Sequence, residues 1–135
     1  ALAARLAARH ATPEEIRVLA SMIEDDRAIL GDPQALSRSN RRFHHQIHLA
    51  SHNRYLVQQL DLVHRSMALM ARTSLAAKGR DAVSLDEHQQ IVDAIAERDG
   101  ERAEQALRRH ISMAFETRLK EDARLAAAGG IGLDV

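Results

Sequence analysis

Histidines crowd into one short stretch of this 135-residue chain, the segment NRRFHHQIHLASHN at positions 40–53. His44, His48 and His52 follow one another at intervals of four residues, and His45 lies between the first two. Neutral imidazole binds zinc, nickel and similar metals, and two histidines one helical turn apart can chelate an ion. Two interpretations compete: a metal site within this helix, or ordinary polar positions. The second is favoured, because the stripe drifts around the helix axis over eight residues.

A different metal site would draw its ligands from three helices. His44, His88 and His110 each lie close to the apolar line of a predicted helix, so the three rings could share one interior space. The neighbouring apolar positions are Phe43 and Ile47, Ile91 and Ile95, and Leu107 and Ala114. Three imidazoles and one oxygen ligand would leave one or two coordination positions open. For each histidine alone, a polar residue hydrogen-bonded to a neighbour remains the competing interpretation, and His10 and His64 have no partner at ligand spacing.

The elements that must position these histidines are predicted to be helices. Hydrophobic residues make up 45% of the chain and aromatic residues only 2%, which is typical of helical proteins rich in Ala and Leu. No segment alternates apolar and polar residues over a useful length, so strands are not expected. We predict an all-α antiparallel bundle of about six helices over residues 1–127, followed by a flexible tail at 128–135.

Capping signals set the expected helix ends. Thr12 and Glu15 predict a capping box with Pro13 in the first turn, Asn53 predicts the cap of a fourth helix, and Ser84 with Glu87 predicts the cap of a fifth. The residues expected to face inward are Leu2, Leu6, Ile16, Leu19, Ala20, Ile23, Leu30, Leu36, Phe43, Ile47, Ala50, Leu56, Leu60, Val63, Met67, Met70, Ile91, Ala94, Ile95, Ala103, Ala106, Leu107, Ile111, Ala114 and Leu119.

Composition also limits the function. The formal net charge is zero, which argues against nucleic-acid binding by this segment alone, since that needs an excess of Lys and Arg on one face. The absence of cysteine excludes disulfides and thiolate chemistry. No apolar run approaches the roughly 20 residues that cross a bilayer, so no membrane contact is expected. The chain begins with Ala1 and no helix start signal, so we expect its N-terminus to be a cut within a helix.

Three segments, taken in order, resemble a known family: NRRFHHQIHLASHNRYL, RTSLAAKGR and SLDEHQQIVDAIAERDGERAEQALRRHI. They resemble the FCD domain, the C-terminal effector-binding domain of the FadR subfamily of GntR transcription regulators. The matching positions are Asn40, Phe43, His44, Asn53, Glu87, His88, Ile91, Ala94, Ile95, Asp99 and His110, and the resemblance extends from about Leu2 to Leu119. It implies a bundle of six or seven antiparallel helices in a cytoplasmic, homodimeric regulator, with DNA bound by an N-terminal winged-helix domain that is missing from this chain.

The resemblance also implies the metal ligands. His44, His88 and His110 would hold a divalent ion, zinc or nickel, and Asn40 takes the position where the family usually has Asp. An amide offers its carbonyl oxygen but no negative charge. The site should therefore hold metal less tightly and attract an anionic effector more strongly. Metal is still expected to bind; the alternative is that the histidines bind an anion directly.

An effector follows from the same resemblance. It would be a small organic acid, held by the metal and by an arginine for which Arg72 is the best match, with Arg65 and Arg80 as weaker ones. Two other functions are weighed against this sensing role. One is a metal-dependent hydrolase or lyase using Glu87 or Asp86 as acid or base, although Glu87 is already expected to cap a helix. The other is a dimerisation module with a vestigial site.

Overall fold

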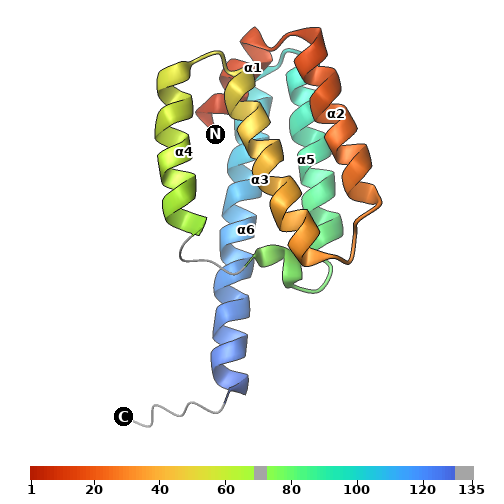
Figure 1. The fold of residues 1–135 in the computed structure, drawn as a ribbon, viewed down its shortest axis with the longest axis vertical. Coiled ribbons are helices and arrows are strands. Elements are labelled where there is room, and N and C mark those ends of the chain that lie inside the picture. Colours follow the sequence, from red (N-terminus) through yellow and green to blue (C-terminus); the bar gives the residue numbers. More distant parts are fainter. Residues whose placement is uncertain (69–72, 130–135) are drawn as a thin grey trace.

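The computed structural model describes residues 1–68 and 73–129, which form an all-α bundle (Figure 1). Its elements are α1 (Leu2–His10), α2 (Pro13–Arg27), α3 (Pro33–Ala50), α4 (Arg54–Ala68), the short 3-10 helix η1 (Ser74–Ala76), α5 (Arg80–Ala96) and α6 (Gly100–Ala128). No strand occurs within these ranges, so the predicted fold class is confirmed. The expected tail lies outside the described residues from position 130 on. None of the described helices is both long enough and apolar enough to cross a membrane.

The helices differ in how much of their surface is packed. α5 and α6 pack against each other, α1 packs across α3, α5 and α6, and α2 packs against α3 and α5. α4 packs chiefly against α3 and lies at the edge of the bundle, while the second half of α6 extends beyond the other helices (Figure 1). The hydrophobic core is built from buried residues of α1, α2, α3, α5 and the first half of α6.

Several predicted inward positions are exposed. Leu119 lies on the second half of α6, which extends beyond the other helices, Ile111 is exposed on α6 directly after the buried His110, and Val63 is exposed on α4. Ala20 and Leu30 of the predicted second stripe are also exposed. Met70 lies outside the described residues. The other predicted core residues of α3 and α5 are buried, as expected: Leu36, Phe43, Ile47, Ala50, Ile91, Ala94 and Ile95.

α1 packs through alanine rather than leucine. It buries Ala3, Ala4, Ala7 and Ala8, whereas Leu2 is 50% exposed. Methyl side chains allow two helix backbones to approach closely, and at Gly100 the ideal Cβ position lies only 3.3 Å from the Arg5 carbonyl oxygen. The expectation that Leu2 and Leu6 form the inward face is thus wrong for α1, because the close contact with α6 selects the smallest residues.

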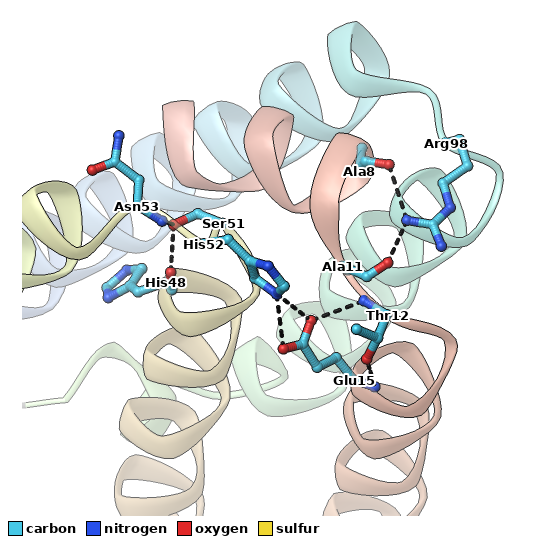
Figure 2. A network of polar contacts seen from close by, with 9 residues as sticks. All are labelled: Ala8, Ala11, Thr12, Glu15, His48, Ser51, His52, Asn53 and Arg98. Atoms are coloured by element: carbon cyan, nitrogen blue, oxygen red, sulfur yellow. Dashed lines mark hydrogen bonds and ion pairs between the residues drawn. The ribbon is translucent and has the colours of Figure 1, made fainter.

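A network of polar contacts closes the end of the bundle where α1 meets α2 (Figure 2). The predicted capping box is present: the Glu15 amide donates to Thr12 Oγ1 at 3.1 Å, and the Thr12 amide donates to the Glu15 carboxylate at 2.9 Å. Arg98 reaches across from the α5–α6 turn and donates to the carbonyl oxygens of Ala8 and Ala11. These contacts satisfy backbone groups that a helix terminus leaves unpaired.

Of the two other predicted helix caps, the one at α4 is present and the one at α5 is not. Asn53 Oδ1 accepts the Leu56 amide at 3.0 Å, as expected for a cap of α4. The cap predicted for α5 is wrong, because α5 begins one turn earlier at Arg80, after Gly79 with a φ of 76°. Glycine adopts this left-handed conformation without steric cost, so the chain enters the helix before Ser84. Ser84 is then buried inside α5, and Glu87 is available for other contacts.

The capping box yields a first prediction. Thr12→Ala should lower the free energy of unfolding by about 1 kcal/mol, because the Glu15 amide loses its acceptor at the helix terminus. Urea denaturation followed by circular dichroism measures this change. Thr12→Ser keeps the hydroxyl and should stay close to the parent protein. Equal stability of the alanine and serine variants would contradict the role given to this hydroxyl.

Candidate metal centre

Three buried imidazole rings meet inside the bundle: His44 from α3, His88 from α5 and His110 from α6. Their residues are 7%, 3% and 4% exposed. The Nε2 atom of His110 lies 3.2 Å from that of His88 and 3.3 Å from that of His44. Two nitrogens bound to one tetrahedral ion, each about 2.0–2.1 Å from it, are separated by about 3.3 Å. The spacing of the three rings therefore suits one shared metal ion.

Phe43 fixes the orientation of two of these rings. Its side chain is fully buried and stacks on His88, with ring centroids 4.2 Å apart and an interplanar angle of 22°. The same ring meets His44 edge to face, at 5.7 Å and 82°. Such aromatic contacts restrict how a neighbouring ring can rotate. The residue before His44 in the sequence thus acts on a ligand candidate from a different helix.

Glu87 and Arg80 form a polar contact behind the third ring. His110 Nδ1 lies 2.8 Å from Glu87 Oε1, and the same oxygen accepts a hydrogen bond of 2.6 Å from Arg80. A carboxylate at Nδ1 favours the tautomer with its proton on that nitrogen, which leaves the Nε2 lone pair facing the other two histidines. The spacing of Ser84 and Glu87 predicted a helix cap and not this contact. The sequence signal for the contact is the spacing of Arg80 and Glu87, which lie two turns apart on one helix.

The protonation states of these groups suit metal binding. Burial, reinforced by the neighbouring imidazoles, holds the pKa of His44 well below 6.5. Burial also lowers the pKa of His88 well below this value, with further contributions from His110 and the Arg80 guanidinium. Burial alone would raise the pKa of Glu87, but hydrogen bonds from His110 and Arg80 outweigh it and lower that pKa. His44 and His88 are therefore neutral, and Glu87 is ionised.

The side chain of Asn40 also suits a metal ion near the three histidines. Its Oδ1 atom is buried and has no hydrogen-bond partner among the described residues. Asn40 and His88 line the same small cavity, together with Leu36, Leu75, Leu85, Asp26, Asp81 and Ser84. A buried acceptor without a partner costs about 1–3 kcal/mol, which a cation bound nearby would offset. Three imidazole nitrogens and this amide oxygen are a donor set that fits a divalent ion.

The alternative site within one helix does not form. His52 has a φ of 54° at the end of α3, and its Nε2 lies 3.0 Å from both carboxylate oxygens of Glu15 (Figure 2). It is therefore separated from His44 and His48. His48, expected to be an ordinary polar position, is buried instead, and with His45 it lies close to Asp61 of α4. Sequence spacing could not reveal this second group, because it joins two helices.

Two of the three arginines proposed for the effector lie among the described residues, and their surroundings differ. Arg80 is buried and is linked to the histidine cluster through Glu87. Its Nε atom has no hydrogen-bond partner within the part of the chain that the structure describes. Arg65 is exposed on α4, and Arg72 lies outside the described residues. Among the described arginines of this set, Arg80 is the one that the fold brings next to the cluster.

Burial of neutral histidines predicts a pH dependence for the metal-free protein. Because the pKa values of His44 and His88 are below 6.5 in the folded state, the unfolded chain binds more protons between the folded and unfolded pKa values. The free energy of unfolding should be highest above pH 6.5 and fall on acidification, by up to about 1.4 kcal/mol per pH unit for each histidine.

Urea denaturation of chelator-treated protein between pH 5 and pH 8 measures this slope. The double variant His44→Gln, His88→Gln should lose most of it and keep the part due to His48, whose pKa burial lowers to about 4. An unchanged slope in the variant would show that these two rings titrate normally.

Comparison with known proteins identifies the family of this chain. The sequence profile of the FCD domain matches residues 1–113. The galactonate operon transcriptional repressor of Escherichia coli (strain K12) is 32% identical over 105 residues, which cover 76% of this chain and 45% of the repressor. The HTH-type transcriptional repressor NanR of Salmonella newport (strain SL254) is 32% identical over 111 residues, 80% of this chain and 42% of NanR. The chain thus spans less than half the length of these relatives. It belongs to the FCD domain family of GntR-type transcription regulators.

Proposed function

We propose that this effector-sensing domain binds a divalent metal ion, zinc or nickel, on His44, His88, His110 and Asn40, and binds a small carboxylate effector at the same place. The observation that carries the proposal is the approach of three buried imidazole nitrogens, at 3.2 and 3.3 Å, in an environment that keeps His44 and His88 neutral. Zinc and nickel both accept imidazole ligands. The three imidazole nitrogens therefore already have the spacing that one shared metal ion requires.

Charge makes a carboxylate the favoured effector. Three neutral imidazoles and the amide of Asn40 bring no negative charge to the ligand set, and the carboxylate of Glu87 faces His110 Nδ1 instead of the shared space. When bound, the ion would supply a positive charge and an open coordination position to an anionic oxygen. The amide in place of the usual carboxylate should weaken metal binding and strengthen anion binding.

The surrounding residues can hold the rest of such a molecule. Arg80 keeps a buried Nε without a partner among the described residues, which could donate to a carboxylate. Asp26, Asp81 and Ser84 line the cavity beside His88 and could bind hydroxyl groups. One relative is named for the galactonate operon, and galactonate is a small hydroxylated carboxylate. Arg72 and Arg65 remain further candidates for the effector contact.

The position of the cluster suggests how binding could be transmitted. Its members come from α3, α5 and α6, so an effector that binds one packing of these helices more tightly would shift the population toward it. In the full-length protein, which we propose to be a cytoplasmic homodimer, this shift would alter DNA binding by a different domain. Among the described residues, Glu87 is held by Arg80 and His110 and Asp86 is exposed, so no contact there favours the hydrolase or lyase interpretation, and none favours the vestigial dimerisation module.

The metal assignment predicts a loss of bound ion. The double variant His88→Ala, His110→Ala should contain about one ion fewer per chain than the parent protein, because two of the three imidazole ligands are gone. Metal analysis by mass spectrometry after dialysis measures the content. The exposed control His10→Gln should retain the parent value. Equal content in the parent and the double variant would refute the assignment of these ligands.

The effector assignment predicts stabilisation that depends on metal. A thermal-shift screen of small carboxylates should identify a ligand, which at 100 times its Kd stabilises by about 2.7 kcal/mol. A chelator should abolish this effect. Asn40→Asp, which adds a negative charge, should hold metal more tightly and bind the same carboxylate more weakly. Stabilisation of equal size with and without chelator would separate the effector from the metal.

A further inference from the structure

We propose a second divalent metal site between α3 and α4, formed by His45, His48 and Asp61, with the exposed His64 beside them as the candidate for a fourth ligand. The ligand atoms of His45, His48 and Asp61 lie within 4.8 Å of one another. The four residues form two pairs, each three positions apart on its own helix, so each pair lies on one helix face. This group shares no residue with the cluster of His44, His88 and His110, although both use α3.

The distances suit a single ion. His45 Nδ1 lies 3.2 Å from Asp61 Oδ1, close to the roughly 3.3 Å expected between two ligands of a tetrahedral metal. The ring of His48 lies 5.1 Å from that of His64 between centroids, and 6.4 Å from that of His45. Both helices therefore direct ligand-type side chains toward one space between them.

His48 is the observation that distinguishes this group from an ordinary surface ion pair. The residue is only 4% exposed, and its Nδ1 has no hydrogen-bond partner among the described residues. Burying an imidazole nitrogen without a partner is unfavourable, and a bound ion would satisfy it.

The ligand set differs from the central one in charge and closure. His45, His48 and Asp61 supply two imidazoles and one carboxylate, which neutralises part of the ion's charge, and the His64 imidazole would complete the four protein ligands typical of a structural zinc site. The His45 and Asp61 side chains are 47% and 35% exposed, which gives the ion a route from solvent. A site of this kind needs no anionic effector to complete it.

We expect the ion at this second site to stabilise the packing of α4 against the bundle. α4 packs chiefly on α3, with Leu56 and Leu60 only partly buried against the core. Tyr55, Leu62 and Val63 are exposed, so the apolar contact is narrow. An ion shared by the two helices would hold α4 in place, close to the central cluster, because the rings of His64 and His44 are 6.3 Å apart.

Zinc titration of the metal-stripped chain by isothermal calorimetry tests the proposal. The parent protein should bind two ions per chain at micromolar zinc. His45→Gln, Asp61→Asn should bind one, and the variant should fold like the parent protein because both side chains are partly exposed. His88→Ala, His110→Ala should also bind one, and the exposed control His10→Gln should bind two.

Hydrogen exchange supplies a second measurement. In the His88→Ala, His110→Ala protein, zinc should slow amide exchange in α4 at least tenfold, and this protection should vanish when His45→Gln and Asp61→Asn are added. Equal zinc stoichiometry in the parent and in His45→Gln, Asp61→Asn would overturn the second site, as would a second ion bound only at millimolar zinc. If the His88→Ala, His110→Ala variant bound as many zinc ions as the parent protein, this result would count against the central site alone.

Discussion

Three imidazole rings are buried side by side in the interior of a small helical bundle, and the arrangement of the domain follows from what this burial requires. Charged histidines would repel one another and lose their hydration, so burial favours the neutral form at His44 and His88. Neutral rings still need partners for their nitrogens. Glu87, which is held by Arg80, contacts His110 Nδ1, and Phe43 packs against the rings of His44 and His88. The inner nitrogens are left facing one another, which is the condition a metal ion can exploit.

Aromatic residues are scarce in this chain, and the core around the three histidines is built mainly from aliphatic side chains. Of three Phe and Tyr residues, Phe43 is buried, while Tyr55 and Phe115 are exposed. Alanines on α1 instead bring the backbones close together, and Ile and Leu side chains from α2, α3 and α5 fill the centre. Close packing of this kind leaves little room for rings to change position. The ligand candidates are thus held by their surroundings, not by contacts with one another alone.

α3 contributes histidines to two polar groups, the central histidine cluster and the group that faces α4. His44 points into the bundle, and the next residue, His45, points toward α4. Successive residues on a helix are turned by about 100°, so neighbouring histidines can serve different helix pairs. The central ligand set lacks a carboxylate, whereas the set toward α4 includes Asp61. The first suits recognition of an anion, and the second suits a fixed connection between helices.

The sequence by itself determined the properties that depend on neighbours along the chain. Apolar periodicity and capping residues predicted the helices, the Thr12–Glu15 capping box, the inward faces of α3 and α5, and the three histidines that converge. Contacts between helices were decided only by the tertiary structure. In the structure, α1 packs through alanine instead of leucine, and Leu119 is exposed because α6 extends beyond the other helices. Glu87 contacts His110 instead of capping α5, and His45 pairs with Asp61. Helical phase states which way a side chain points along its own axis, but not how far the next helix extends or which of its residues lies opposite.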